Sequence, residues 1–555
     1  MRSAVAVLAG VAAAVLAGLS LAFLGNGLHG VTGWAALIAG VAVAVAAFMA
    51  TPRSAARHPS TFWDWVMIVA FAVASARAFF WLLYQDGDSW KVLSPNNLGD
   101  LALHISFINW FAATPEWWPS SPILAGDPLR YPPGSDLFNA LLLTVGVPVT
   151  SGLIWSGIVG AALAGYALWR WGGTVALAAF LFNGGLAGFT ILHTGWGADP
   201  DATTEWKNLF LTLFVTQRGF LFALPAGLLL LAAWREAAFG NSDRKLIPLP
   251  LQVLLLGSMP LFSIHTALFL GVAMAGLFFL APSSRRLMSM LALLAWPPMA
   301  FFGWLVTSGC GGPSAAHALG LAPGWMADGT LRFWIWNFGI ALPLALLLCG
   351  VLSRRGGDRE ARAFVWPAAM VFVLCMVVRL APWPWDNLKL MLWSWLVVAP
   401  YLWIVLLEKR PLIPRACAAF LLFGSGAVTL ALGLDSRHGY EMVKPSDLHK
   451  AAAALKGIPA GDVIACAPDY NQPVLVLGHP VVCGYEGHLW SHGLDYKKRW
   501  EILESIMKGE PDWQGKAKKL GVSHIYWGDL EAKRWPESKL PWAQEEATPA
   551  LHRLK

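Results

Sequence analysis

Apolar runs long enough to cross a lipid bilayer recur through most of this 555-residue chain, from Ala4 to Leu434. A spanning helix needs about 20 apolar residues, and these runs predict about 13 spans. Because 57% of the residues are hydrophobic and only 13% are charged, a soluble enzyme is excluded. The sequence predicts a mainly α-helical, polytopic transmembrane bundle, which we place at residues 1–435.

The first apolar run follows Met1 and Arg2 and has the length of a full span. A secretory signal peptide has a shorter apolar core, of about 7–15 residues. A second run follows directly at Val31 to Ala50. We therefore interpret the first run as an uncleaved membrane span.

The net charge of +7 comes from Lys and Arg residues that gather in short clusters between the apolar runs. This is a topology signal rather than a nucleic-acid-binding stripe, because loops rich in Lys and Arg stay in the cytoplasm. Five loops are cytoplasmic on this basis, and they carry Arg53 and Arg57; Arg235, Arg244 and Lys245; Arg285 and Arg286; Arg354, Arg355, Arg359 and Arg362; and Lys409, Arg410 and Arg415.

The loops between these clusters then face outward, namely residues 85–134, the turn near His265, Ser308 to Gly329, and Ala381 to Asn387. The last span, Ala416 to Leu434, leads the rest of the chain to the outer side. The span count within residues 135–233 stays open, because Leu137 to Arg170 could be one span preceded by a short helix, or two spans.

After Asp435, charged residues and short elements replace the apolar runs. Alternating helices and strands predict a small α/β domain at residues 436–555. Cys466 and Cys483 could pair if this domain is extracytoplasmic, and without a CxxC motif zinc and c-type haem are not expected. The expected helices are Asp447–Leu455 and Tyr496–Met507, and the expected strands are Val463–Cys466, Val474–Leu477, Val481–Cys483 and Val522–Tyr526.

The outward loop at residues 85–134 is rich in acids, aromatics and prolines. Asp100 and His104 are four residues apart, so a helix over Pro95–Ala113, capped by Ser94, puts both side chains on one face. Its other face is apolar, and we expect the helix to lie along the membrane surface. The pair would act as a base or as metal ligands. Alternatively, Asp100 stabilises the helix N-terminus and His104 is interfacial.

Asp86 and Asp88 form a DxD pattern at the end of a span. Such a pattern can hold a divalent cation, Mg²⁺ or Mn²⁺, and Asp100 would be a further ligand. The pattern is short and also occurs by chance. The alternative interpretation is therefore a solvated turn.

Arg218 lies in the apolar run from Leu209 to Leu231, where a charge needs an anionic partner or a wet cavity. An acid such as Asp199 or Asp201 could be its partner in the resting protein. A lipid phosphate is the functional alternative, because a guanidinium binds phosphate through two hydrogen bonds. Otherwise Arg218 is a structural ion-pair residue.

Lys389 flanks an outward loop, with Asp386 beside it. It would add a point charge to a phosphate site, or it would simply snorkel or pair with Asp386. His265 stands between two short apolar segments. It either lines a cavity in a broken helix or is a satisfied histidine at a turn.

The segment Gly484 to Trp500 concentrates aromatics and histidines within a few positions. Tyr485, His488, Trp490 and His492 suit contacts with a sugar or a lipid headgroup. The alternative is a well-packed loop over the small sheet. Zinc binding by the two histidines is not expected, because the intervening residues do not demand a helix.

Five separate motifs stand out in this chain, and they are GDLALH at Gly99–His104, GDPLRYP at Gly126–Pro132, TQRGFLFALP at Thr216–Pro225, WDNLK at Trp385–Lys389 and GYEGHLWSHGLDYKKR at Gly484–Arg499. Together they resemble the motifs of the C-type glycosyltransferase (GT-C) superfamily. More narrowly, they resemble a group of mostly uncharacterised multispanning bacterial and archaeal proteins with a GYxGxLWSHG segment in a terminal domain.

The resemblance implies a glycosyltransferase that moves a sugar from a polyprenyl-phosphate carrier to an acceptor. Transfer would take place at the outer face of the cytoplasmic (inner) membrane of a bacterium or archaeon, with inversion if the acceptor attacks directly. Asp100 best matches the acid of the first outer loop, with Asp86 and Asp88 as competitors and His104 in support. Arg218 and Lys389 would hold the donor phosphate. Further substrate contacts would come from Arg130, Tyr131, His265, Asp386, Tyr485, His488, Trp490 and His492.

Two other classes of function stay open for this sequence. One is a lipid or glycan transporter or flippase, in which buried charges line a path. The other is a non-catalytic membrane component that binds glycan through the terminal domain. The Asp100→Asn variant separates the first from a transferase, because only a transferase needs the carboxylate as a base.

Overall fold

The computed structural model of the chain describes residues 1–53, 60–196, 200–240, 246–309, 320–327, 330–354, 356–435, 439–543 and 550–554. Several residues named above lie outside these ranges, namely Arg57, Asp199, Arg244, Lys245 and Arg355. The helical body is formed by α1 (Arg2–Leu24), α2 (Gly30–Ala50), α3 (Phe62–Phe80), α4 (Asn97–Ala113), α5 (Gly134–Thr144), α6 (Val149–Leu181), α7 (Ile191–Thr194), α8 (Phe220–Phe239), α9 (Leu249–Gly257), α10 (Ile264–Leu280), α11 (Arg285–Val306), α13 (Leu331–Phe338), α14 (Ala341–Leu352), α15 (Arg359–Val377), α16 (Pro384–Leu402) and α17 (Leu412–Gly433).

Within the described part of the chain, nine helices are long and apolar enough to cross a membrane. The helices α13 and α14, bent by 92° at their junction, would together make a tenth span, and two further apolar helices are shorter. The chain is therefore a multi-pass membrane protein. The predicted count of about 13 spans is not confirmed.

The segment after the first outer loop follows the first of the two alternatives. The short helix α5 leads into α6, which is 33 residues long. The helix α6 is broken at Gly172 and Gly173, where Gly173 has a φ of +57°. Only glycine adopts such a φ without strain, so the pair allows a bend within one long element.

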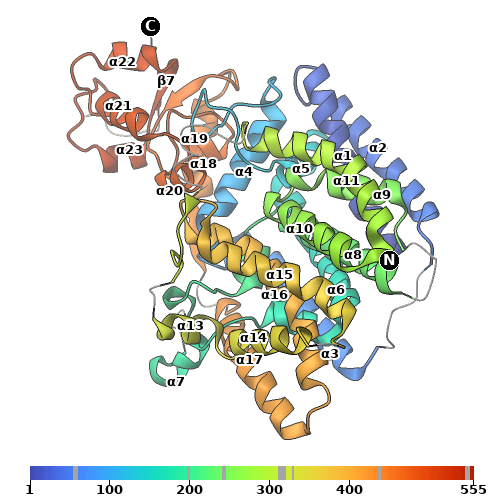
Figure 1. The fold of residues 1–555 in the computed structure, drawn as a ribbon. Helices are drawn as coiled ribbons and strands as arrows, with labels where there is room; N and C mark the ends of the chain where they lie inside the picture. Colours follow the sequence, from blue (N-terminus) through green and yellow to red (C-terminus); the bar gives the residue numbers. More distant parts are fainter. Residues whose placement is uncertain are drawn as a thin grey trace.

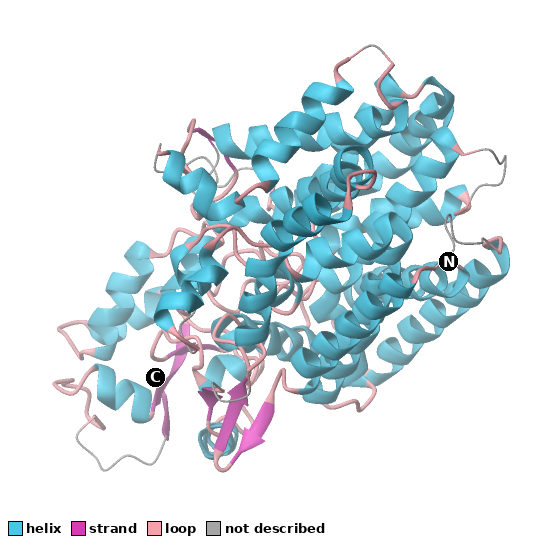
Figure 2. Cartoon of the chain, turned by 90° about the horizontal axis from the view of Figure 1, so that it is seen from below, coloured by secondary structure: helices cyan, strands magenta, loops and turns pink. Residues whose placement is uncertain are grey.

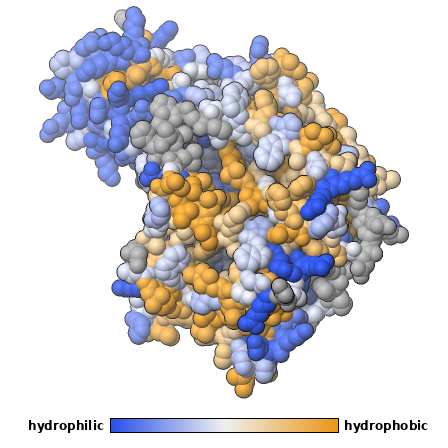
Figure 3. Space-filling model, viewed as in Figure 1, coloured by the Kyte–Doolittle hydropathy of each residue, from blue (hydrophilic) through white to orange (hydrophobic). Residues whose placement is uncertain are grey.

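The C-terminal domain stands at one end of the helical body (Figure 1). Half of the eight strands of the described residues belong to this domain, and most strands lie at this end of the molecule (Figure 2). Hydrophilic residues cover much of its surface, whereas hydrophobic residues are prominent on the body (Figure 3). This contrast agrees with a bundle embedded in lipid and a domain surrounded by water.

The C-terminal part of the chain contains helices around the strands β6 (Val463–Ala465), β7 (Val522–Trp527) and β8 (Ala550–Arg553). β7 runs parallel to β6 and antiparallel to β8. The expected helices correspond to α18 (Pro445–Ala454) and α21 (Lys497–Met507). Cys466 and Cys483 are buried free thiols in this structure, and their pairing stays a prediction.

The strand predicted at Val474–Leu477 is wrong, because this segment forms the short helix α19 (Pro473–Val476). Pro473 occupies the first turn, where its missing N–H costs nothing, and the Gln472 side chain accepts from the backbone N–H of Val474. The strand predicted at Val481–Cys483 is reduced to a single bridge between Val481 and Ile464.

The first outer loop and the C-terminal domain are joined by backbone hydrogen bonds. The loop forms a hairpin of β1 (Tyr84–Asp86) and β2 (Ser89–Val92), and β5 (Tyr440–Val443) adds to β2 in antiparallel register. The N–H of Gly484 donates to the carbonyl of Ile123 at 2.8 Å. Arg499 and Asp127 form an ion pair of 2.9 Å across the same contact. The domain is therefore docked on the loop.

The helix α4 ends at Ala113, as predicted, but it does not lie along an exposed surface. It packs against α5 on one side and against α19 and β5 of the C-terminal domain on another. Leu101, Ile105 and Ile108 are all buried. A helix that is apolar nearly all round is buried on several sides rather than amphipathic. Its N-cap is Asn96 rather than Ser94.

The close approach of Gly478 to α4 predicts that two glycine variants of the C-terminal domain differ in stability. Gly478 has a φ of +89°, and a Cβ there would lie 2.8 Å from the carbonyl carbon of Asn109 in α4. Gly457 has a φ of +86° with nothing within 4 Å of such a Cβ. Changing either residue to Ala strains the backbone by about 1–2 kcal/mol. Only Gly478→Ala should also undock the domain.

Thermal unfolding and limited proteolysis of the full chain measure this difference. We expect Gly478→Ala to lower the melting temperature more than Gly457→Ala does. We also expect it to make the C-terminal domain more susceptible to protease. Equal behaviour of the two variants would show that the contact with α4 does not hold the domain.

Candidate functional site

Side chains from six separate segments converge beneath the docked C-terminal domain, and we call this set the polar cluster. Gln217 donates a hydrogen bond to Asp100 at 3.0 Å, and Lys389 pairs with Asp386 at 2.7 Å. The charges of Lys389 and Asp386 act on Asp100, on His265 and on His492. The members of the polar cluster are Asp100, His104, Tyr131, Gln217, His265, Asp386, Lys389 and His492.

Aromatic contacts connect the loop and the domain within the polar cluster. The ring of Tyr131 lies 5.9 Å from that of His104 and 5.2 Å from that of His492, between ring centroids. His492 follows α20 (Glu486–Ser491) of the C-terminal domain. The domain therefore contributes directly to the site that the membrane helices and the first loop form.

The WDNLK motif places Asp386 and Lys389 by means of the residue between them. Asn387 is fully buried, and its side chain donates to the carbonyls of Cys375 at 2.8 Å and Val378 at 2.9 Å. These bonds tie the first turn of α16 to the end of α15. Asp386 and Lys389 then lie three residues apart on one side of α16, where they can pair.

Two further contacts bring α10 and the segment before α8 to the polar cluster. The indole N–H of Trp393 in α16 donates to the hydroxyl of Thr266 at 3.1 Å. This bond holds the start of α10, and with it His265, beside α16. A Cβ on Gly219 would lie 2.0 Å from the carbonyl oxygen of Phe262, so only glycine lets the Gln217 segment approach this turn.

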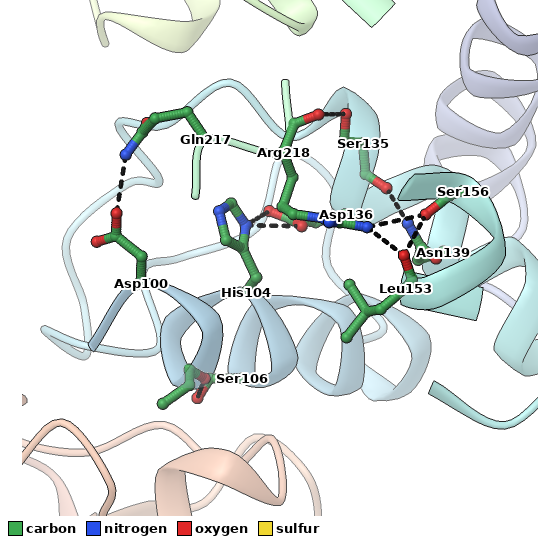
Figure 4. A network of polar contacts seen from close by, with 11 residues as sticks. Asp100, His104, Ser106, Ser135, Asp136, Asn139, Leu153, Ser156, Gln217 and Arg218 are labelled. Atoms are coloured by element: carbon green, nitrogen blue, oxygen red, sulfur yellow. Dashed lines mark hydrogen bonds and ion pairs between the residues drawn. The ribbon is translucent and has the colours of Figure 1, made fainter. Parts of the chain in front are cut away.

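A sealed network lies beside the polar cluster (Figure 4). The Nδ1 atom of His104 lies 2.9 and 3.0 Å from the two carboxylate oxygens of Asp136. The charge of Asp136 acts in turn on Arg218. The guanidinium donates to the carbonyl of Leu153 and, at 3.1 Å, to the hydroxyl of Ser156. His104, Asp136 and Arg218 are at most 2% exposed.

The burial of Arg218 argues against its predicted role as a phosphate ligand. The residue is 1% exposed, so no substrate group reaches its guanidinium in this structure. Among the described side chains its anionic neighbour is Asp136. The two predicted acids are not tested, because Asp199 is outside the described residues and Asp201 has no described side chain. Lys389, whose side chain is 17% exposed, is the more accessible cation.

Burial sets the proton affinity of the polar cluster. Desolvation is the largest influence on Asp100 and raises its pKa, whereas the charges of His104 and Lys389 and the hydrogen bond from Gln217 act in the opposite direction. Burial, followed by the charge of Lys389, lowers the pKa of His492 to about 4. Burial also raises the pKa of Tyr131 well above its ordinary value.

The other predicted residues of the terminal segment line the same part of the domain. His488 is 7% exposed, and its ring lies 6.4 Å from that of His492 and 5.2 Å from that of Tyr485. Trp490 is 43% exposed, 6.4 Å from Trp383. Arg130 is half-buried in the loop before Tyr131. Contacts of these residues with a substrate stay predictions.

The DxD pattern is not part of the polar cluster. Gly87, at a φ of +61°, and Asp88 form the turn between β1 and β2. Asp86 pairs with Lys91 at 2.6 Å, and Asp88 accepts a hydrogen bond from Ser446 at 3.0 Å. This is the solvated turn that was the alternative interpretation.

The predicted metal ligands do not come together as a site. In the described ranges no three His, Cys, Asp or Glu side chains are grouped so that they could hold a metal ion. Asp86, Asp88 and Asp100 therefore do not form a three-carboxylate centre. A cation site made by the protein alone does not fit the residues present.

Sequence reasoning missed two members of these networks, Asp136 and Gln217. Asp136 is 32 residues from His104 along the chain, and Gln217 is 117 residues from Asp100. The one available signal was a polar patch, Thr216 to Arg218, within an apolar run. Such a patch usually faces other polar groups.

No protein-family profile and no curated protein matches the chain. Among solved structures it is similar to the arabinofuranosyltransferase AftD from Mycobacteria, with 16% identity, a TM-score of 0.47, and coverage of 85% of this chain and 37% of that one. It is also similar to ArnT from Cupriavidus metallidurans bound to undecaprenyl phosphate, with 12% identity, a TM-score of 0.42, and coverage of 85% of this chain and 95% of that one.

A third likeness is to the oligosaccharyltransferase of Archaeoglobus fulgidus in the apo form, with 14% identity, a TM-score of 0.36, and coverage of 89% of this chain and 74% of that one. The chain thus spans little more than a third of the length of the mycobacterial protein. All three TM-scores are below 0.5. The function has to be argued from the residues of this chain.

Proposed function

We propose that this protein is a GT-C-type glycosyltransferase that moves a sugar from a polyprenyl-phosphate carrier to an acceptor hydroxyl. The observation that carries the proposal is that Asp100, which accepts a hydrogen bond from Gln217, lies within the electrostatic influence of Lys389, under a docked domain and next to membrane helices. A carboxylate and an ammonium group so placed can serve the two ends of a group transfer. The sequence motifs that resemble the GT-C superfamily supply most of these residues.

In this proposal Asp100 is the general base. Its carboxylate accepts the proton of the acceptor hydroxyl as the hydroxyl oxygen bonds to the anomeric carbon. The bond from that carbon to the phosphate oxygen breaks, and the electron pair leaves with the lipid phosphate. Direct displacement inverts the anomeric centre. Burial raises the pKa of Asp100 and so strengthens it as a base once it is ionised.

Lys389 is the proposed contact for the donor phosphate, and Asp386 positions it. A positive charge close to the leaving phosphate stabilises the negative charge that develops there. His265, Tyr131 and His492 would contact the sugar or the acceptor, with Arg130, Tyr485, His488 and Trp490 further out. A Mg²⁺ or Mn²⁺ requirement is proposed only as an ion carried by the donor phosphate. No step is assigned to it.

The polar cluster lies outside the cytoplasm in this proposal, in a bacterial or archaeal inner membrane. Single cysteines introduced into a variant in which all six native cysteines are replaced by alanine test the orientation. We expect Lys508→Cys, in the C-terminal domain, to react with an impermeant maleimide in intact cells. Arg354→Cys, in a basic loop, should react only after lysis. The reverse pattern would overturn both the topology and the function.

The base is tested by Asp100→Asn, which keeps the shape of the side chain and removes its ability to accept a proton. Loss of a general base lowers the rate by about 10²–10⁴. We expect this loss in transfer assays, with melting temperature and donor binding near wild type. Asp86→Asn, an exposed acid of the same loop, should remain active. Transfer by Asp100→Asn close to wild type would exclude Asp100 and favour a transporter.

Lys389 and Arg218 should respond differently to loss of charge. Lys389→Gln should weaken binding of a polyprenyl phosphate tenfold or more, which is about 1.4 kcal/mol. Arg218→Gln should bind the lipid like wild type but unfold at a lower temperature, because Asp136 loses its cationic neighbour. Thermophoresis in detergent measures the affinity for the lipid. An unchanged affinity of Lys389→Gln would show that the phosphate binds elsewhere.

A further inference from the structure

The sealed network beside the polar cluster offers His104 only one hydrogen-bonding arrangement at Nδ1. Both oxygens of Asp136 face this nitrogen at 2.9 and 3.0 Å, and both residues are at most 2% exposed. An ionised carboxylate can only accept, so Nδ1 carries a proton. In the neutral ring Nε2 then has its lone pair free, and the ring becomes a cation when Nε2 also gains a proton.

Asp136 is itself held from the side opposite to His104. The charge of Arg218 acts on it, and the Arg218 backbone carbonyl accepts from the hydroxyl of Ser135, its sequence neighbour, at 3.0 Å. The Nε and Nη1 atoms of Arg218 have no hydrogen-bond partner among the described residues. An uncompensated buried guanidinium is costly. The charge of Asp136 acts on Arg218, so the two residues form a buried pair of opposite sign.

Asp100 needs a positively charged neighbour if it is to act as a base. Desolvation, the largest influence on Asp100, favours its neutral acid, which cannot accept a proton. The charge of His104 is the first influence in the opposite direction. Asp100 and His104 stand one turn apart on α4, on the side that faces Gln217 and Asp136 (Figure 4). A positively charged His104 therefore stabilises the carboxylate form of Asp100.

We propose that Asp136 is a positioning residue for the transfer reaction: it orients His104 and stabilises its cationic form, and so keeps Asp100 ionised for the acceptor hydroxyl. This inference rests on the proposed function. Asp136 does not touch substrate. It acts through His104, in the way that a buried carboxylate fixes the tautomer and charge of a histidine in other sites.

The reaction balances with these groups alone. The hydroxyl proton moves to Asp100 as the new carbon–oxygen bond forms, and the lipid phosphate leaves with the electron pair of the broken bond. The cationic His104 keeps its two protons. The other titratable or charged groups around this pair stay unchanged in an Asp136 variant, and they are Tyr131, Arg218, His265, Asp386, Lys389, His488 and His492.

The test is the pH profile of kcat/KM for sugar transfer by the full chain, with wild type beside Asp136→Asn. Without the carboxylate, His104 is less readily cationic, so Asp100 takes up a proton at higher pH. We expect the acidic limb of the profile to move upward by about one to three pH units, since an opposite charge at this range shifts a carboxyl by that much. At neutral pH kcat should fall, while KM for the donor stays near wild type.

A role confined to stability would lower activity at every pH without moving the limb, and that result would overturn the inference. Asp136→Glu should partly restore the wild-type profile. Ser106→Ala is the matched control, because Ser106 is fully buried in α4 and its hydroxyl bonds only to the carbonyl of Ala102. Its profile should coincide with wild type. If Asp136→Asn does not fold, the double variant Asp136→Asn, Arg218→Gln removes both charges and should show the same shift.

The two proposals fail in different ways. If wild type transfers sugar and the limb of the Asp136 variants does not move, only the positioning role is overturned. If wild type transfers no sugar from any polyprenyl-phosphate donor, the proposed function is overturned, and the positioning role with it. A shifted limb together with an inactive Asp100→Asn supports both.

Discussion

The docking of the C-terminal domain onto α4 is the contact on which the properties of the polar cluster depend. Backbone hydrogen bonds from the segment around Val481 and Gly484 hold the domain to the first loop. This coverage leaves Asp100 and His492 only partly exposed, and burial raises the pKa of the first and lowers that of the second. Each shift favours an uncharged group. A base in this place therefore needs charged neighbours to stay ionised.

The cations Arg218 and Lys389 have different surroundings. Arg218 is closed off with Asp136, and the pair stabilises the interior without meeting solvent. Lys389 keeps part of its surface and pairs with Asp386, which an arriving phosphate could replace. A compact ammonium group exchanges partners more readily than a guanidinium whose donors are fixed to a backbone carbonyl and a hydroxyl. The same chemical reasoning that suggested Arg218 as a phosphate ligand therefore applies better to Lys389.

Much of the architecture could be predicted from the sequence, because hydrophobic runs and the change of composition after Asp435 are local properties. The pairing of Asp100 and His104 on one helix face was predictable for the same reason. The burial of α4 was not, since the covering elements are far away in the chain. Asp136 was one of several acids in or next to the first loop, and its role could not be predicted because its partner is 32 residues away. The DxD pattern misled, since an acid–glycine–acid sequence also suits a hairpin turn.

Three of the motifs combine two kinds of residue. One faces the polar cluster, and the other is a packed residue that fixes its position. In WDNLK, Asn387 is anchored to the end of α15 and presents Asp386 and Lys389. Before α8, Gly219 admits the carbonyl of Phe262, and Gln217 reaches Asp100. At the start of α4, a Cβ on Gly99 would crowd His488 at 3.2 Å. A residue of a sequence motif can therefore have a packing role rather than a chemical one. The contacts in the folded chain show which of the two roles it has.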